Sequence, residues 1–394
     1  MIPAREILDL RSEWSLDPGI IEKDYVLGWL LAGIANNPEL ATSWVFKGGT
    51  CLRKCYYETY RFSEDLDFTV VNNGPEAPED LIVIFQSVRD WLQEESGIGL
   101  IVDDSSFQRR VNRRGNPTTQ GRLAYRGPNP PPQLPKVKID ITSDEIHARQ
   151  GVIRPIGHQY SDMLPVSEGA VCYSLVELFA EKLRALAERC RPRDLYDVVH
   201  MHRHPDLIGR APDVASVLAQ KCQHAGIEVP TLESIHSSPF RGELEAEWES
   251  MLGHQLPSPL PPFAGFWNTL EPVFAWLVGA VAVAVPPRAG AAVKDLDPEW
   301  LPPKAITSWR RGFPVELIRY AGANRLKVDI DYRAEEGRQG LRRVEPYSLR
   351  RTNDGNLLLF VVNDFGALRG YRVDRIAGAR PTSETFIPSY LVEL

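Results

Sequence analysis

The chain has 394 residues, of which 43% are hydrophobic and 25% charged, a balance typical of a globular protein too long for one ordinary core. Lys and Arg number 45 against 52 Asp and Glu, and the net charge of −7 excludes a uniformly basic surface for non-specific DNA binding. Residues 301–394 hold 16 Lys and Arg but only 11 Asp and Glu, which predicts a separate module at that end.

The first predicted element is a helix. Asp17 followed by Pro18 is a typical helix start, because an N-cap side chain and a proline at the first helical position both suit it. Apolar residues then recur at helical spacing until Asn36-Asn37-Pro38 stops the pattern. We therefore expect an amphipathic helix between these two signals.

A strand, a glycine turn and a helix are expected next. The apolar residues 44–46 run into Lys47-Gly48-Gly49-Thr50, and residues 52–60 have a helical pattern. A helix that opens from such a turn favours anions, because its unpaired N–H groups and dipole face outward. A double glycine before a helix is more often only a turn, so the residues alone leave both interpretations open.

Two later segments alternate polar and apolar residues with the period of a half-buried strand. Residues 65–70 place Asp65 and Asp67 on one face, and residues 137–142 place Asp140 on one face. If the apolar faces of both strands share one core, the three carboxylates meet on the other side.

Three carboxylates held together repel one another unless cations bind them. Oxygen ligands without His or Cys suit Mg²⁺, which also accompanies nucleotide phosphates. The alternative is that these acids only solvate the outer face of a sheet. Asp is a poor strand former, however, so two of them at i and i+2 carry a propensity cost.

Arginines dominate the segment after a helix predicted over about 79–95. Six of them occur without any acid before the proline-rich PNPPPQLP: Arg109, Arg110, Arg113, Arg114, Arg122 and Arg126. A charge run is usually a solvated loop. Beside a nucleotide site, the lack of compensating acids favours binding of a polyanion, either an RNA acceptor or a triphosphate.

Residues 171–200 have a wholly helical pattern. Lys182 shares the face of an apolar stripe, so it either snorkels to solvent or reaches a charge. Asp194 opens a helix and is either its N-cap or a site residue, while Arg193 and Asp197 have the spacing of a helical ion pair.

Three histidines end this segment, at positions 200, 202 and 204. His200 and His204 have an i, i+4 spacing that suits a metal. No HExxH pattern or acidic companion accompanies them, so a zinc site is not favoured.

Proline-rich segments at 255–262 and 286–287 bracket a connecting helical region. Its longest apolar run, Phe274–Val285, is shorter than the ~20 residues that cross a bilayer, and we expect a buried helix there. From about residue 313 the chain becomes β-rich, and Asn353-Asp354-Gly355 predicts a hairpin.

Cysteine usage and the first residues indicate a cytoplasmic protein that does not contact membranes. No C-x-x-C occurs, and the start MIPAREILDLRSEW lacks the basic and apolar segments of a secretory signal. Neither a disulfide scaffold nor a Cys-rich zinc site is supported by the five cysteines: Cys51, Cys55, Cys172, Cys190 and Cys222.

Together these segments resemble a known family. The run FKGGTCLRKCYYETYRFSEDLDFTV resembles the first motif of the DNA polymerase β-like nucleotidyltransferase superfamily. With VKIDI, EKLRAL, RPRDLYDV and the early IEKDYVLGWLL, the ordered set is similar to AbiEii/AbiGii-type nucleotidyltransferase toxins over about 20–250. The resemblance implies an α+β fold, with a polymerase β-like core of mixed sheet and flanking helices and a helical continuation.

The resemblance also implies a reaction, the transfer of a nucleoside monophosphate from an NTP to an acceptor hydroxyl with release of pyrophosphate. Asp65 and Asp67 would hold two Mg²⁺ ions about 4 Å apart, with Mn²⁺ as an alternative, and Asp140 would complete the nucleophile-side site. Lys182 is the fourth catalytic candidate. The residues implied to bind the nucleotide are Gly48, Gly49, Thr50, Arg61, Ser63, Lys182, Asp194 and Asp197.

The stretch from Val344 to Ala379 looks like a WYL-type domain, a small SH3- or Sm-like β-barrel associated with ligand or nucleic-acid sensing. Leu357-Leu358-Leu359 lies about where the name-giving Trp-Tyr-Leu would be. A basic, aromatic-bearing face for RNA or a nucleotide could be formed by Arg350, Arg351, Tyr371, Arg372 and Arg375. The alternative is a barrel whose arginines only solvate it.

The sequence thus predicts a nucleotidyltransferase core at 1–165, a helical and connecting region at 166–300 and a β domain at 301–394. We expect a prokaryotic toxin of a toxin–antitoxin or phage-defence system. The resemblance suggests GTP or CTP as donor, tRNA or another RNA end as acceptor, and a cognate antitoxin. The rival hypotheses are an enzyme that modifies a protein or small molecule, and an inactive module that senses a nucleotide or nucleic acid.

Overall fold

The computed structural model describes residues 1–57, 59–112, 115–129, 133–165, 169–281, 286–291, 293, 295–300, 315–335, 337 and 339–394. The expected domain boundaries at 166 and 301 fall outside these ranges, as do Arg113 and Arg114 of the arginine cluster.

The first half of the chain forms a mixed sheet in the order β3-β5-β6-β2-β1-β8-β7, with β4 paired to β5. The β2–β6 and β1–β8 pairs are parallel and the others antiparallel. The strands are β1 (Trp44–Lys47), β2 (Asp65–Val70), β3 (Gly99–Ile101), β4 (Phe107–Val111), β5 (Pro117–Arg126), β6 (Lys136–Thr142), β7 (Val152–Arg154) and β8 (Ala170–Cys172).

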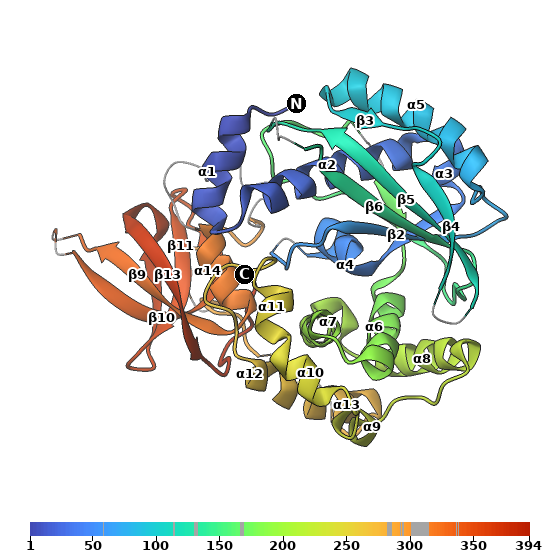
Figure 1. Ribbon diagram of the computed structural model, residues 1–394. Coiled ribbons are helices and arrows are strands. Elements are labelled where there is room, and N and C mark those ends of the chain that lie inside the picture. Colours follow the sequence, from blue (N-terminus) through green and yellow to red (C-terminus); the bar gives the residue numbers. More distant parts are fainter. Residues whose placement is uncertain are drawn as a thin grey trace.

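Two long helices cover the apolar face of this sheet, α2 (Pro18–Asn36) and α5 (Pro78–Ser96) (Figure 1). The side chain of Asp17 caps α2 by accepting from the Gly19 N–H at 2.8 Å, as the sequence predicts. Aromatic rings of the sheet, such as Trp44 and Phe68, pack 5.0 Å apart beneath α5. The short helices α1 (Ala4–Trp14) and α3 (Pro38–Ala41) flank α2.

The opposite face meets two helices. The chain forms β8 and then α6 (Leu175–Arg189) and α7 (Pro192–His202), so the prediction that residues 171–200 are wholly helical is wrong for 171–174 and for the break at 190–191. The break lies at Cys190, which adopts a left-handed φ of 46°, followed by the proline that starts α7. The helix expected over 52–60 is a short α4 (Gly48–Cys51) and a π-helical turn that ends at Tyr56.

Further helices follow α7 along the chain and lie around α6 and α7 (Figure 1). They are α8 (Ala211–Ala225), α9 (Leu232–His236), α10 (Arg241–Ala246), α11 (Trp248–Leu252), α12 (Phe263–Asn268) and α13 (Leu270–Leu277). The helix expected over Phe274–Val285 ends at Leu277, and Val278 is 75% exposed; residues 282–285 lie outside the description. None of the described helices has both the length and the apolar character needed to cross a bilayer.

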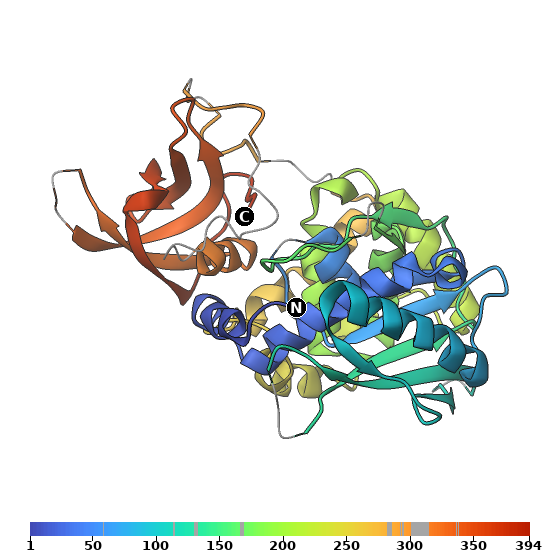
Figure 2. The ribbon, with the colours of Figure 1, turned by 90° about the horizontal axis from the view of Figure 1, so that it is seen from above.

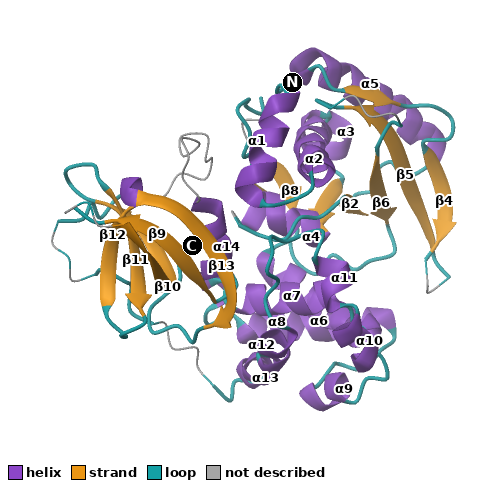
Figure 3. Cartoon of the chain, turned by 60° about the vertical axis from the view of Figure 1, so that its left-hand side comes forward, coloured by secondary structure: helices purple, strands orange, loops and turns teal. Residues whose placement is uncertain are grey.

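The C-terminal part forms an antiparallel sheet in the order β12-β11-β10-β9-β13, set at one end of the molecule (Figure 2). Helix α14 packs between this sheet and α1 (Figure 3). The hairpin predicted at residues 353–355 joins β10 to β11, with Gly355 at a φ of 84°. The elements are α14 (Val315–Ala323), β9 (Leu326–Arg333), β10 (Gln339–Arg351), β11 (Leu357–Asn363), β12 (Leu368–Arg372) and β13 (Ile376–Thr385).

Candidate active site

Two adjacent strands bring the acidic side chains to one face of the first sheet. β2 and β6 run parallel, and their register places Asp67 beside Asp140 and Asp65 beside Lys138. The apolar residues between them are buried on the other face, because side chains alternate along a strand. The structure therefore gathers the three predicted acids on the face that meets α4, α6 and α7.

The carboxylates of Asp65 and Asp67 have no neutralising partner. Over the described ranges, neither takes part in a hydrogen bond or ion pair. Burial, followed by repulsion from Asp140, raises the pKa of Asp67 to about 7. Burial also raises the pKa of Asp65, although Lys138 opposes this. Such shifts are typical of carboxylates whose charge needs a cation.

Asp140 differs because it already has partners. Gln120 donates from Nε2 to its Oδ1 at 3.0 Å, and Lys138 forms an ion pair with its Oδ2. Burial alone would lower the pKa of Lys138, but Asp140 raises it, helped by Asp65 and Asp67. A positive charge therefore already lies in the field of all three acids.

The donor set fits a hard divalent cation, because all three side chains offer only oxygen. Asp65 and Asp67 are free to bind such an ion. The oxygens of the three acids do not all lie within 4.8 Å of one another, so a site shared by all three needs their side chains to move closer together. With that adjustment the residues fit the implied metal.

The glycine turn lies directly against the acids. Gly48 has a φ of +80°, and a Cβ there would lie 2.3 Å from Oδ2 of Asp67. A Cβ on Gly49 would lie 2.5 Å from Nη2 of Arg61 and 3.0 Å from Oγ of Ser63. Only glycines allow this close approach, which brings the first backbone N–H groups of α4 beside Asp67.

Thr50 is fully buried, and its hydroxyl donates to the backbone oxygen of Asp65. The hydroxyl expected to contact a phosphate therefore ties the turn to β2. This bond fixes the position of the first acid relative to the helix start.

Lys182 reaches charge rather than solvent. From α6, its Nζ lies 2.7 Å from Oδ2 of Asp197 and 3.5 Å from Oδ1 of Asp194. Arg61 donates to both oxygens of Asp197 at 2.7 Å, and Arg189 donates to both oxygens of Asp194 at 2.7 and 2.8 Å. These bonds hold the ammonium of Lys182 in one place.

Three residues predicted to bind the nucleotide form ion pairs inside the protein, Arg61 with Asp197, and Asp194 with Lys182 and Arg189. Arg61, Asp194 and Asp197 are at most 2% exposed. Burial alone would raise the pKa of Asp197, but Arg61 and Lys182 hold it well below its ordinary value. Arg61 also lies against the glycine turn, and the contact of these three side chains with a nucleotide stays a prediction.

Comparison with known proteins decides the family. Residues 29–279 match the model described as nucleotidyl transferase AbiEii toxin, type IV TA system. The chain belongs to this family. It is a nucleotidyltransferase toxin, as the motifs around Asp65 and Asp67 predict. A second model, the WYL domain, matches residues 315–381, which confirms the resemblance proposed for the C-terminal sheet.

Solved structures show more distant likenesses. MenT4, a nucleotidyltransferase toxin from Mycobacterium tuberculosis H37Rv, is 21% identical with a TM-score of 0.48, and the match covers 70% of this chain and 88% of that one. Proteasome accessory factor B/C of Arthrobacter aurescens is 13% identical with a TM-score of 0.18, over 46% of this chain and 33% of that one. No curated protein sequence matches the chain.

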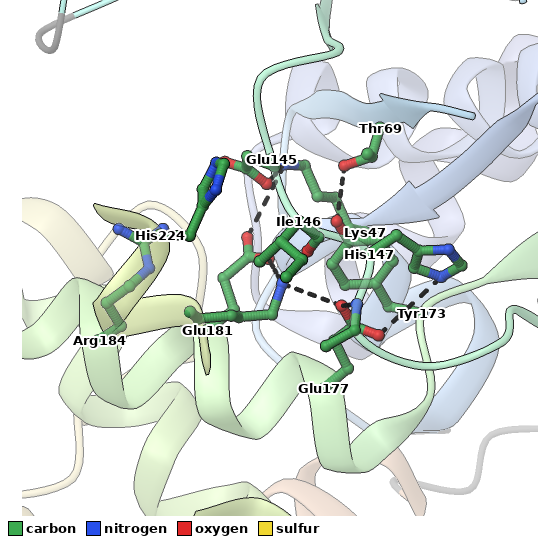
Figure 4. A network of polar contacts seen from close by, with 12 residues as sticks. Lys47, Thr69, Glu145, Ile146, His147, Tyr173, Glu177, Glu181, Arg184 and His224 are labelled. Atoms are coloured by element: carbon green, nitrogen blue, oxygen red, sulfur yellow. Dashed lines mark hydrogen bonds and ion pairs between the residues drawn. The ribbon is translucent and has the colours of Figure 1, made fainter. Parts of the chain in front are cut away.

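A polar network anchors the AbiEii helix α6 against the sheet (Figure 4). The ammonium of Lys47, directly before the glycine turn, pairs with Glu145 and lies 4.0 Å from Glu181 on α6. Lys221 lies 3.0 Å from Glu177, one turn earlier on that helix. Burial alone would lower the pKa of Lys47, but Glu145 and Glu181 raise it, so it stays charged beside Asp67.

Lys47 and Lys138 are the site residues that the sequence analysis did not assign. Each lies on a strand beside an acid, with Lys47 opposite Asp67 and Lys138 opposite Asp65. The alternation already places Lys138 on the face of Asp140. The pairing of β1 with β2, which brings Lys47 there, becomes visible only in the fold.

The AbiEii sheet becomes basic toward its β4 edge. Register aligns Gln120 with Asp140 and Arg122 with Lys138 on one face. Arg110, Arg122 and Lys136 line a hollow of about 260 Å³ together with Gln120, and the two arginines are exposed. Two of the four described arginines of the cluster, Arg110 and Arg122, therefore lie near Gln120, which contacts Asp140, whereas Arg109 lies 3.6 Å from Glu76.

The histidines after the RPRDLYDV motif do not gather around a metal. His200 is buried, with Nε2 3.3 Å from Oδ1 of Asn324, and His204 accepts from the Asp206 N–H at 3.2 Å. Among the described side chains, only the sulfurs of Cys51, Cys55 and Cys172 form a tight group of possible metal ligands. Spacing in the sequence could not show this, because Cys172 comes from β8.

The arginines of the WYL part are mostly paired locally. Arg351 lies 2.5 Å from Asp297, Arg372 lies 2.7 Å from Asp374, and Arg375 lies 3.0 Å from Glu335. Arg350 pairs with Glu393, and Tyr371 packs on Tyr332 at 4.6 Å. These pairs favour the solvating interpretation for this face.

Proposed function

We propose that this AbiEii toxin transfers a nucleoside monophosphate from an NTP to the hydroxyl of an RNA end, with GTP or CTP as favoured donor, and depends on Mg²⁺. Its growth-blocking effect would be countered by a cognate antitoxin. The observation that carries the proposal is the face of β2 and β6, where Asp65 and Asp67 are unpaired beside Asp140. The glycine turn opens a helix next to them.

Mg²⁺ ions, when bound by Asp65, Asp67 and Asp140, would supply charge for the triphosphate and acidify the attacking hydroxyl. The N–H groups at the start of α4 would hold the terminal phosphates, because a helix N-terminus favours anions. Lys182, held by Asp197, would add a fixed positive charge from the side of α6. Fixed charges of this kind act where negative charge develops.

The proposed transfer forms one bond and breaks one bond at the α-phosphorus of the NTP. The acceptor oxygen forms a bond to the α-phosphorus while the bond from that phosphorus to the bridging β-phosphate oxygen breaks. Pyrophosphate leaves with the electron pair. The acceptor proton passes to a basic oxygen, for which Asp140 is the candidate that the family resemblance implies.

The basic edge of the sheet supports an RNA acceptor. Arg110, Arg122 and Lys136 line a hollow together with Gln120, whose side chain donates to Asp140. Arg122 donates to Oε1 of Gln120 at 3.0 Å. A row of cations that ends at the nucleophile side suits a phosphate backbone whose terminal hydroxyl reaches the acids.

The test is a transfer assay with the full chain, Mg²⁺ and each of four α-labelled NTPs. Total RNA, a protein pool and a small-molecule pool are offered separately. We expect label in RNA, and Asp67→Asn should lose it. Label that appears only in protein or in small molecules would refute RNA as the acceptor. Metal-dependent NTP binding without transfer to any pool would refute the proposal that this protein transfers a nucleoside monophosphate.

A growth assay tests the biological part. Induced expression is expected to stop growth, and Asp67→Ala is expected to relieve the arrest. Equal toxicity of both chains would separate growth arrest from nucleotide transfer.

A further inference from the structure

A second cavity lies between the AbiEii region and the WYL part, away from the carboxylates. Its volume is about 410 Å³, within the range of small-molecule sites. Tyr57, Thr59 and Arg203 line it from the first, and Arg325 and Arg350 line it from the second. No residue assigned to nucleotide transfer is among the residues that line it.

Three polar atoms on this wall have no protein partner. Tyr57 Oη, Thr59 Oγ1 and Arg203 Nη1 are buried without a hydrogen bond in the described structure. All three can donate. A buried donor without an acceptor costs about 1–3 kcal/mol, so three around one cavity indicate an acceptor that the chain itself does not supply.

The positive charge on the wall also lacks an anionic partner. Among the described residues, no carboxylate pairs with Arg203 or Arg325, and the one side-chain hydrogen bond of Arg325 is to the Gly322 carbonyl at 2.8 Å. Burial lowers the pKa of Arg203 to about 10. Burial and then the charge of Arg203 lower the pKa of Arg325. A guanidinium that is destabilised by burial and by a second guanidinium favours an anion beside it.

Glu393, an acidic residue that lines the cavity, already has cationic partners. Glu393 pairs with Arg350 and also lies 3.4 Å from Arg288, so it neutralises only one of these two cations. Neither Arg203 nor Arg325 has a carboxylate partner among the described residues. The wall therefore offers at least two positive charges to a ligand.

We propose that this cavity binds a phosphate-bearing small molecule of about mononucleotide size, with the phosphate between Arg203 and Arg325. A phosphate has enough oxygens for both guanidinium groups and for the hydroxyls of Tyr57 and Thr59, whereas a carboxylate has only two. The remaining volume, beside the rings of Tyr57 and His204, accommodates a ring or sugar.

The experiment uses the full chain in buffer with a metal chelator, so that metal-dependent binding at the carboxylates does not contribute. The probes are inorganic phosphate, pyrophosphate and ADP, with adenosine and acetate as uncharged and carboxylate controls. Binding is measured by calorimetry and by the shift of the melting temperature. We expect ADP or pyrophosphate to raise the melting temperature, and adenosine and acetate to leave it unchanged.

The variants are Arg203→Gln and Arg325→Asn, the latter because asparagine tolerates the left-handed φ of 59° at this position. Each is expected to weaken binding of the best probe at least tenfold. Arg372→Gln, which breaks a surface pair with Asp374, is the matched control and is expected to bind normally. In the probe-free chain, Arg203→Gln is expected to raise the melting temperature, since it removes an unpaired buried charge.

Three outcomes would overturn the proposal. The first is that no phosphate probe binds at millimolar concentration. The second is that wild type and both cavity variants bind the best probe equally, and the third is that adenosine and ADP bind equally. None of them depends on nucleotide transfer, so a failure here is distinct from a failure of the proposed reaction.

Discussion

The substitution Gly48→Ala tests how closely the glycine turn is built against Asp67. At a φ of +80° an alanine is strained by about 1–2 kcal/mol. Its Cβ would lie 2.3 Å from Oδ2 of Asp67, and an ordinary contact needs 3.4 Å. The carboxylate must therefore move by about 1 Å, and a displacement of this size costs on the order of 100-fold in rate.

The matched control is Gly97→Ala. Gly97 ends α5 with a φ of +74°, and the nearest atom to a Cβ there is 3.8 Å away. Both variants are expected to lose about 1–2 kcal/mol in urea unfolding, but only Gly48→Ala should lose about 100-fold in the rate of NMP transfer. Wild-type transfer by folded Gly48→Ala, or an equal loss in Gly97→Ala, would refute the reasoning.

Three further predictions follow from charges. Asp67→Asn should raise the free energy of unfolding by up to about 4 kcal/mol at pH 8 and by about 1.5 kcal/mol at pH 5. The reason is that the Asp67 carboxyl has a folded pKa of about 7, so the stability that its ionisation costs the wild type grows as the pH rises from 4 to 7. Urea unfolding measures this, and a gain that does not depend on pH would contradict it. Asp197→Asn should cost about 3–5 kcal/mol in the same assay, since Arg61 then lacks a full counter-charge, and a loss below 1 kcal/mol contradicts it. Arg110→Gln and Arg122→Gln should each reduce the slope of log K for RNA against log salt by about 0.7, and unchanged slopes would place RNA elsewhere.

The elements that position the acids could be predicted because their signals are local. The alternation of polar and apolar residues over 65–70 and 137–142 indicates which side chains share a face of a strand. This inference does not require knowing which strands are neighbours in the sheet. The cap at Asp17 and the helical spacing after it likewise define α2 without reference to the rest of the chain. Motifs with such local signals also carried the family resemblance.

What the sequence could not show depended largely on contacts far apart in the chain. Arg61 was predicted to contact the nucleotide, and no local signal indicated its partner in the fold, Asp197, which lies 136 positions later. The pattern over 171–200 is helical throughout, but β8 takes its first residues, and the left-handed turn at Cys190 with Pro192 after it divides the rest. Val278 belongs to an apolar run but is exposed, so apolar composition alone did not report burial there.

The bond between Arg61 and Asp197 limits how this protein can be divided. A chain cut near residue 165 would keep Arg61 and lose Asp197, Lys182 and α6, together with β8 of the sheet. The guanidinium of Arg61 would then lose its anion, and the face of the sheet that α6 and α7 cover would be exposed to water. The strand-bearing and helical halves are therefore one folding unit, and expression of the sheet alone should yield insoluble fragments rather than a smaller toxin.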